Sequence, residues 1–309
     1  MKDLILFGDC RETLKEFDEK ARCCVTSPPY YGLRDYGGED NQIGQEQSPE
    51  EYIQEMVNVF RLVRDNLTDD GTLWLNIGDS YYNYRPGKGG LPQQTVSNTK
   101  QDLPDQCNRR ANKLEGLKEK DLIGIPWMLA FALRADGWYL RQDIIWHKPN
   151  PMPESVRDRC TKSHEYLFLL SKNKKYYYDN ESIKEPAKDW GTRDRTNGKY
   201  HNKGTGLQPH SGLTKSYPTK NKRSVWSITN KPYKGAHFAV FPPDLIIPCI
   251  KAGSEKNDII LDPFMGSGTT AMVAKELGRY YIGCELQEDY GNLIKNRVGE
   301  VRGDLKEFL

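Results

Sequence analysis

Apolar residues recur along this chain in two periods that alternate from one segment to the next. Short, compact apolar runs predict buried strands at residues 4–7, 21–25, 72–77, 138–146, 258–261 and 280–284. Apolar positions three and four residues apart predict amphipathic helices at residues 11–20, 50–66, 126–136, 243–252 and 269–277. Strands that alternate with helices predict an α/β fold built on a largely parallel sheet.

Residues near the ends of these segments predict where some of them start and stop. Ser48 predicts the N-cap of the helix over 50–66, and the acidic, glycine-containing stretch 69–71 predicts the turn that ends it. Residues 164–171 and 175–178 predict a hairpin that completes the sheet.

Two long segments show neither period. Residues 83–121 follow a strand directly and are rich in Gly, Gln and Asn, which predicts a mobile lid. Residues 184–234 carry twelve Lys or Arg against three acids, with five Trp and Tyr interleaved. This composition suits a nucleic-acid contact and equally a solvated insertion. The residues predicted to bind DNA are Arg193, Arg195, Lys199, Lys203, Lys220, Lys222 and Arg223.

Composition narrows the class of protein. The chain has 309 residues, of which 37% are hydrophobic, enough for one substantial core with a small appendage. It has no apolar run long enough for a membrane helix and no signal-peptide pattern at its start, so a cytoplasmic protein without membrane contact is expected. Seven cysteines without a C-x-x-C pair predict reduced thiols and no metal site.

The first candidate for chemistry is Ser27-Pro28-Pro29-Tyr30, which follows the predicted strand over 21–25. Two prolines fix the backbone and aim its carbonyls, at the strand end where open α/β sheets bind ligands. Ser27 and the Pro28 carbonyl can accept hydrogen bonds, and Tyr30 offers a flat face. The turn therefore suits a planar ring that carries an exocyclic amine, although a proline turn with a packed tyrosine is the simpler alternative.

The second candidate is the loop that begins at Asp262 and continues through Gly266-Ser267-Gly268 between a strand and a helix. Glycines let a ligand approach the backbone, and the helix N-terminus favours an anion. Glu285, at the tip of the next strand, is placed for ribose hydroxyls. The loop is not a P-loop, because no lysine follows its second glycine, and it lacks the glycine pattern of NAD sites.

Together, Thr26-Ser27-Pro28-Pro29-Tyr30 and the stretch 262–270 resemble the DNA amino-methyltransferases that use S-adenosyl-L-methionine. Their order along the chain is similar to that of the circularly permuted β group. The resemblance covers nearly the whole chain, since the further stretches 8–9, 71–79, 148–153 and 237–242 also match family patterns.

The resemblance implies a Rossmann-like, mixed seven-stranded α/β sheet with helices on both faces. It implies a catalytic half at 1–183, a basic target-recognition insertion at 184–236 and a cofactor-binding half at 237–309.

The resemblance also implies individual roles. Ser27, Pro28, Pro29 and Tyr30 would be the catalytic residues. Phe264, Gly266 and Gly268 would cradle the methionine part of the cofactor. Thr269 would reach its carboxylate, Asp262 its amino group and Glu285 its ribose. Asp9 would lie by the adenine edge, or simply cap the following helix, and Phe241 and Pro242 would close the pocket. Asn76 or Asp79 could hold the edge of the target base, with a capping role as the alternative.

The expected substrate is a base flipped out of double-stranded DNA. A serine at the first motif position resembles the cytosine-N4 enzymes, whereas aspartate is usual in adenine-N6 enzymes, so cytosine N4 is favoured and adenine N6 is the alternative. An RNA or small-molecule methyltransferase, or a DNA-binding protein without activity, is the alternative from another class. A cognate restriction endonuclease is a possible genetic partner, and the sequence leaves the recognition site and the oligomeric state open.

Overall fold

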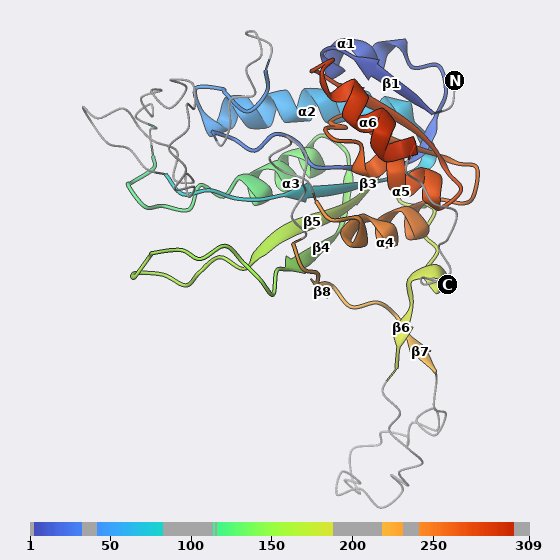
Figure 1. The fold of residues 1–309 in the computed structure, drawn as a ribbon. Helices are drawn as coiled ribbons and strands as arrows, with labels where there is room; N and C mark the ends of the chain where they lie inside the picture. Colours follow the sequence, from blue (N-terminus) through green and yellow to red (C-terminus); the bar gives the residue numbers. More distant parts are fainter. Residues whose placement is uncertain are drawn as a thin grey trace, which may run out of the picture.

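One large mixed sheet organises the chain (Figure 1). The computed structural model describes residues 3–32, 42–82, 114, 116–187, 218–230 and 241–299. Within these ranges the sheet has the strand order β1-β10-β9-β2-β3-β5-β4-β8. Its strands are β1 (Leu4–Phe7), β10 (Tyr280–Glu285), β9 (Ile259–Asp262), β2 (Ala21–Thr26), β3 (Leu67–Ile77), β5 (His164–Ser171), β4 (Tyr139–His147) and β8 (Val225–Ser227).

Strand direction confirms the predicted fold class. β1, β10, β9, β2 and β3 run parallel, whereas β5 is antiparallel to both β3 and β4. Seven of the strands form the expected sheet. The eighth, β8, comes from the predicted recognition insertion and pairs in parallel with β4 at Trp146 and Trp226.

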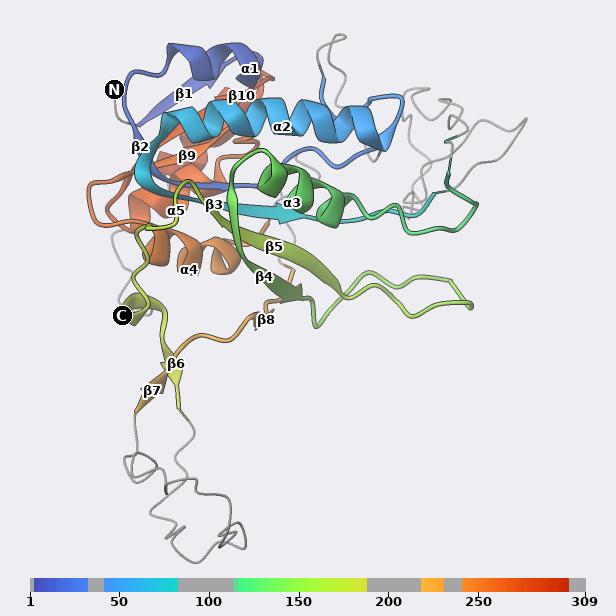
Figure 2. The same cartoon turned by 180° about the vertical axis from the view of Figure 1, so that it is seen from behind.

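Helices cover both faces of the sheet (Figures 1 and 2). On one face lie α1 (Cys10–Thr13), α2 (Pro49–Asn66) and α3 (Ile125–Ala135), and on the other lie α4 (Pro243–Gly253), α5 (Thr269–Glu276) and α6 (Tyr290–Gly299). The alternation of side chains along β3 separates the two cores. Leu73 and Leu75 pack in the core with α2 and α3, and Trp74 between them packs in the core with α4 and α5.

The longest helix, α2, forms as its sequence predicts. Ser48 has extended backbone and its hydroxyl accepts a hydrogen bond from the Glu51 amide at 3.2 Å, which makes it the N-cap. Tyr52, Met56 and Phe60, spaced four residues apart, are fully buried.

Two predicted boundaries were wrong. The helix expected over 11–20 is α1 followed by a 3-10 turn, Leu14–Glu16. The backbone at Phe17 is already in an extended conformation. Only one turn of apolar positions faces the core there, which is too little to hold a longer helix. The turn expected at 69–71 lies inside β3, which begins directly after α2. A Cβ at Gly71 would lie 2.9 Å from the Thr68 carbonyl oxygen, so glycine permits the strand to bend there.

The hairpin expected from 164–171 and 175–178 was also wrong, because β5 pairs with β3 and β4 and residues 175–178 form no strand. Their tyrosines pack instead of pairing. Tyr178 stacks on Trp74 with ring centroids 6.3 Å apart, and the Tyr177 ring lies 5.2 Å from the Arg22 guanidinium. Aromatic residues are typical of strands, but these pack from an irregular segment. Periodicity alone does not distinguish the two cases.

The two segments without periodicity lie partly outside the described residues. Of the predicted lid, the described end folds back on Tyr82, whose amide donates to the Asp121 carbonyl at 2.8 Å. Of the predicted recognition insertion, β6 (Glu185–Pro186) and β7 (Thr219–Lys220) form a two-stranded ribbon that projects from the sheet (Figure 1).

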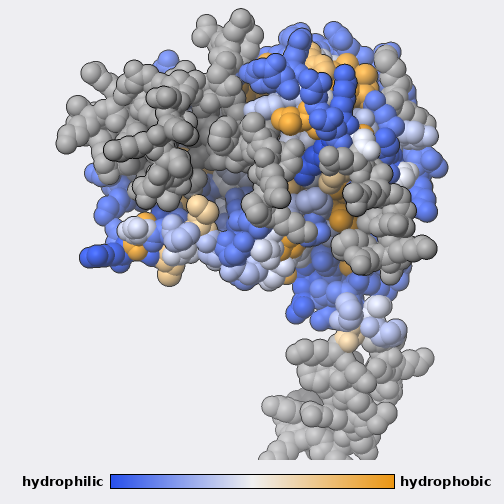
Figure 3. Space-filling model, viewed as in Figure 1, coloured by the Kyte–Doolittle hydropathy of each residue, from blue (hydrophilic) through white to orange (hydrophobic). Residues whose placement is uncertain are grey.

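The described residues visible in Figure 3 are mainly hydrophilic, with small scattered apolar patches. Among the described helices, none combines the length and apolar character that a membrane crossing requires. No group of three or more His, Cys, Asp or Glu among the described residues could hold a metal ion.

Candidate active site

The two predicted motifs meet at one edge of the sheet. Phe7 of β1 pairs with Glu285 of β10, and Thr26 of β2 pairs with Leu75 of β3. Between β10 and β2 lies β9, which ends at Asp262. Because these five strands are parallel, their carboxyl ends share one edge of the sheet. Strand ends from the first third of the chain and from its last third therefore lie together at this edge.

The predicted cofactor loop has the backbone geometry that its glycines allow. Gly266 and Gly268 have φ angles of 54° and 81°, in the left-handed region that favours glycine. Gly268 immediately precedes α5, and a Cβ there would lie 3.0 Å from Ile294 of α6. A side chain at Gly268 would therefore crowd Ile294, and at both positions the backbone conformation favours glycine.

Glu285 closes the other side of this loop. Its carboxylate accepts hydrogen bonds from the Gly266 amide at 2.8 Å and from the Gln287 amide at 2.9 Å, and the residue is 8% exposed. Burial raises the pKa of this carboxyl to about 7, against the opposing effect of the two amide donors. The Glu285 carboxyl therefore titrates at a higher pH than an exposed glutamate does.

Asp262 connects the two motifs directly. Its carboxylate accepts one hydrogen bond from the Thr26 hydroxyl and one from the Thr270 hydroxyl, each at 2.6 Å. It also accepts from the Phe264 amide at 3.0 Å. Burial raises its pKa to about 6, although the threonine donors oppose the shift. Sequence analysis assigned this carboxylate to the cofactor's amino group and missed both threonines as its partners.

The start of α5 holds a polar atom that lacks a partner. Thr269 is 3% exposed, and within the described part of the chain its hydroxyl makes no hydrogen bond. A buried hydroxyl without a partner costs free energy, so the position fits an anionic ligand group at the helix N-terminus. The two aromatic rings predicted for the pocket pack on opposite faces of the sheet. Phe264 is half-buried against the core of α2 and α3, and Phe241, beside the buried Pro242, against the core of α4 and α5.

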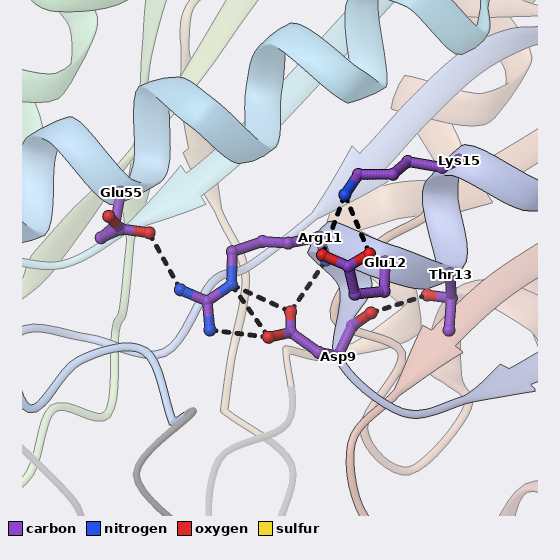
Figure 4. Close-up of polar contacts among 6 residues, drawn as sticks. All are labelled: Asp9, Arg11, Glu12, Thr13, Lys15 and Glu55. Atoms are coloured by element: carbon purple, nitrogen blue, oxygen red, sulfur yellow. Dashed lines mark hydrogen bonds and ion pairs between the residues drawn. The ribbon is translucent and has the colours of Figure 1, made fainter.

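Asp9 acts as a helix cap, in line with the alternative weighed for it (Figure 4). Its carboxylate accepts from the Arg11 amide at 2.8 Å and from the Arg11 guanidinium at 2.6–3.0 Å. Arg11 reaches on to Glu55 of α2 at 2.9 Å. Burial would raise the pKa of Asp9, but the hydrogen bonds from Arg11 outweigh it and the pKa is lowered. The carboxylate stays charged at the tip of β1, next to the Glu285 strand.

The S-P-P-Y turn is held from α2. The Tyr52 hydroxyl donates to the Pro29 carbonyl at 2.8 Å, and Pro28, whose carbonyl is the predicted acceptor, is buried. Ser27, Pro29 and Tyr30 are half-buried. The hydrogen bond from α2 and the two prolines together fix the backbone that follows β2.

Tyr30 takes part in a polar cluster that sequence analysis did not find. Its hydroxyl donates to Glu165 at 2.8 Å, and Glu165 also forms an ion pair with Lys148. Asn76 donates to the Glu165 carboxylate at 3.3 Å and to the Tyr166 carbonyl at 3.1 Å. Burial, followed by the charge of Glu165, raises the pKa of the Tyr30 phenol well above its usual range, against a hydrogen bond from Ser27.

Asp79, the other candidate for the base edge, caps α3. Its carboxylate accepts from the Gly124 amide at 3.0 Å and from the Ile125 amide at 3.1 Å. Lys162 donates to its backbone carbonyl at 2.6 Å. The capping role weighed in the sequence is what the structure shows.

The predicted DNA-binding residues are only partly placed. Arg193, Arg195, Lys199 and Lys203 lie outside the described residues. Lys220 and Arg223 both pair with Glu185, at 3.4 and 2.5 Å, and the Lys222 ammonium lies 4.8 Å from the centre of the Trp226 ring. Lys220 and Arg223 thus connect to Glu185 of β6, whereas Lys222 contacts Trp226 of β8, and the contact of these cations with DNA stays a prediction.

Comparisons with known proteins agree with this geometry. Residues 21–296 match the family N6_N4_Mtase, described as DNA methylase. The Type II methyltransferase M.SmaI of Serratia marcescens is 50% identical over 300 residues, which cover 95% of this chain and 90% of that protein. M.Cfr9I of Citrobacter freundii, also a Type II methyltransferase, is 45% identical over 292 residues, covering 94% and 86%.

Solved structures share the fold. The PvuII DNA methyltransferase (cytosine-N4-specific) has a TM-score of 0.62 at 17% identity, covering 100% of this chain and 90% of that one. A putative DNA modification methylase of Thermus thermophilus, solved in complex with S-adenosyl-L-methionine, has a TM-score of 0.60 at 23% identity, covering 97% and 95%.

Proposed function

The chain belongs to the N6_N4_Mtase family of DNA methylases, and from this premise we propose that it methylates the exocyclic N4 of cytosine. It is an S-adenosyl-L-methionine-dependent DNA methyltransferase, as the two motifs predicted. The observation that carries the choice of base is Ser27 at the first motif position, where the resemblance favours cytosine. The fold is compatible with that chemistry, since the cytosine-N4-specific PvuII enzyme shares it.

The chemistry of the amine gives Ser27 and Pro28 their proposed roles. The lone pair of an exocyclic amine is delocalised into the ring, so the nitrogen is a poor nucleophile until its geometry changes. Acceptors on its hydrogens pull it toward a tetrahedral arrangement and aim it at the electrophilic methyl group that S-adenosyl-L-methionine supplies. The Ser27 side chain and the rigid Pro28 carbonyl provide these acceptors. The methylated nitrogen then loses a proton readily, so no strong general base is required.

The target base reaches these acceptors only outside the duplex. An amine inside the helix is paired and stacked, so the base must be flipped out. Tyr30 offers its ring as a stacking surface beside the turn, which offsets part of the cost of extrusion.

The cofactor roles proposed from the resemblance fit the loop geometry. The left-handed Gly266 and Gly268 leave room for the methionine part against Phe264, and the Thr269 hydroxyl is available for its carboxylate. Glu285 is proposed to bind the ribose, Asp9 to lie by the adenine edge, and Phe241 and Pro242 to close the pocket. Asp262 has both carboxylate oxygens on threonines, so its proposed contact with the amino group is an additional one.

Mass spectrometry of nucleosides tests the choice of base. Purified protein is incubated with unmodified plasmid DNA and S-adenosyl-L-methionine, and the digested DNA is analysed for N4-methylcytosine and N6-methyladenine, with a Ser27→Ala variant as the control. N4-methylcytosine that depends on Ser27 is expected. N6-methyladenine alone would overturn the cytosine proposal, and sequence-resolved mapping of the same DNA identifies the methylated site.

We also propose that residues 184–236 recognise the DNA sequence. This segment lies between the catalytic half at 1–183 and the cofactor half at 237–309. Charge and aromatic residues concentrate in this segment. Exchanging it for the segment of a relative should change the methylated site and leave cofactor affinity intact. If the site stays the same, recognition lies elsewhere.

The relatives' description as Type II methyltransferases supports a cognate restriction endonuclease as a genetic partner. Plasmids methylated by this protein should then resist an endonuclease from the same source. Cleavage of fully methylated plasmid would exclude that partner.

A further inference from the structure

Four side chains from separate parts of the chain meet beside the S-P-P-Y turn. Tyr30 follows β2, Asn76 lies near the end of β3, Lys148 follows β4, and Glu165 lies near the start of β5. Because β5 is antiparallel to β3 and β4, its start lies at the edge where they end. Sheet topology alone therefore assembles this cluster.

Glu165 is the centre of the cluster. Its carboxylate accepts from the Tyr30 hydroxyl and the Asn76 amide and pairs with the Lys148 ammonium. The side chains of Lys148 and Glu165 are only 16% and 15% exposed. For an ion pair this far removed from water, the cost of desolvation offsets much of the attraction, so the pair contributes little net stability.

The contacts restrict how the Tyr30 ring can turn. Its hydroxyl is tied to Glu165 at 2.8 Å, and its ring edge lies so close to Gly78 that a Cβ there would be 2.7 Å from Cε2. Lys148 is itself fixed, since its amide donates to the Ser163 carbonyl at 2.7 Å and its ammonium lies 4.3 Å from the Trp146 ring centre. The phenol stays protonated and remains a donor, because burial raises its pKa.

We infer that Glu165 is a positioning residue, which holds the Tyr30 ring in place for the flipped base, and that Lys148 fixes Glu165. This inference rests on the proposal that the S-P-P-Y turn binds the target base. Tyr30 then needs its hydroxyl as an anchor as well as its flat face. A ring fixed before the base arrives lowers the cost of ordering at the moment of binding.

A double-mutant cycle with Glu165→Gln and Tyr30→Phe tests the inference. Single-turnover methylation is measured on a duplex that carries the mapped site, together with cofactor affinity by calorimetry. Each single variant should slow methylation about tenfold, as expected for one charge-assisted hydrogen bond, with cofactor affinity unchanged. The double variant should be at most about twofold slower than the slower single variant, because each change alone removes the same charge-assisted hydrogen bond: Tyr30→Phe removes its donor and Glu165→Gln its charge.

Asp136→Asn is the matched control for loss of an ion pair. Asp136 pairs with Arg61 and Arg64 and its side chain is 11% exposed, but it lies just before β4, at the opposite end of that strand. It should lower the unfolding temperature and leave the methylation rate unchanged. If Glu165→Gln proves too unstable to assay, the paired change Lys148→Met/Glu165→Leu takes its place in the cycle with the same expectation, because it removes both charges and leaves neither unpaired.

The positioning role would be overturned if the rate of the double variant fell by the product of the two single effects. A Glu165→Gln variant with a normal methylation rate would also overturn it. Ser27→Ala separates this failure from that of the proposed function. If Ser27→Ala is slow while the cycle is multiplicative, only the role of Glu165 is wrong. If Ser27→Ala methylates at the normal rate, the S-P-P-Y turn does not bind the target base and both proposals fall.

Discussion

The two halves of the active site are built in different ways. The cofactor half is continuous in sequence, and its shape comes from backbone: two left-handed glycines, a helix start and the tip of the next strand, all within 262–285. The acceptor half is assembled from side chains of four separate segments around Glu165. The first kind of site tolerates almost no change at its glycines, whereas the second depends on contacts that can be removed one at a time.

The largest effect is expected from blocking the cofactor half alone. Gly266→Val places a branched side chain at a φ of 54°, in a loop where ligand and backbone are proposed to meet. Strain and obstruction together should weaken S-adenosyl-L-methionine binding about a hundredfold or more in calorimetric titration. Gly116→Val is the control, since Gly116 has a φ of 82° but open space around it, and it should bind normally. Undiminished affinity of folded Gly266→Val would remove the loop from the cofactor site.

The acceptor half should respond to removal of the Tyr30 ring. Stacking of a base on an aromatic ring is worth about 1–3 kcal/mol, so Tyr30→Ala should lower catalytic efficiency by about one to two orders of magnitude. A mismatch at the target base removes part of the extrusion cost. It should rescue Tyr30→Ala more than Ser27→Ala, because Ser27 acts on the chemical step. Equal rescue in single-turnover assays on mismatched duplexes would contradict the stacking role.

A dependence of cofactor affinity on pH would distinguish the cofactor half from the acceptor half, because it is expected from Glu285. The ribose hydroxyls need an ionised Glu285 as acceptor, and the pKa of this carboxyl is about 7. Affinity should therefore rise about tenfold from pH 6 to pH 8. Glu285→Gln should bind more weakly at pH 8 and lose this dependence. A native profile that is flat across this range would place the ribose elsewhere.

The smallest effect concerns Asp262, which joins the halves. Its pKa in the folded protein, about 6, lies above the ordinary value of 3.8, so its contribution to stability is full below about pH 4 and is lost as the pH rises through 6. The free energy of unfolding without cofactor should fall by about 1 kcal/mol from pH 5 to pH 7 on account of this group. Urea unfolding of Asp262→Asn should lack this component, whereas an identical pH slope in the variant would show that another group is responsible.

The same contrast explains what could be predicted from the sequence. The cofactor loop, Glu285 and the S-P-P-Y turn are contiguous motifs at strand ends, and the structure places them at one edge of the sheet as expected. Glu165 and Lys148 were missed because their partnership depends on the antiparallel pairing of β5, which was predicted with the wrong neighbour. Thr26 and Thr270 each adjoin a motif, but their joint contact with Asp262 exists only once β2 and β9 pair.

The strand order also has a consequence for how the protein is made. β9 and β10 occupy the positions between β1 and β2, yet more than 200 residues separate Thr26 from Ile259 along the chain. During synthesis β1 and β2 emerge early and lack the neighbours that later lie between them. The middle of the sheet closes only when the last two strands insert, which is a long-range and therefore slow step. The loop after β9 and the central pairing of the sheet therefore form together, after most of the chain has been synthesised.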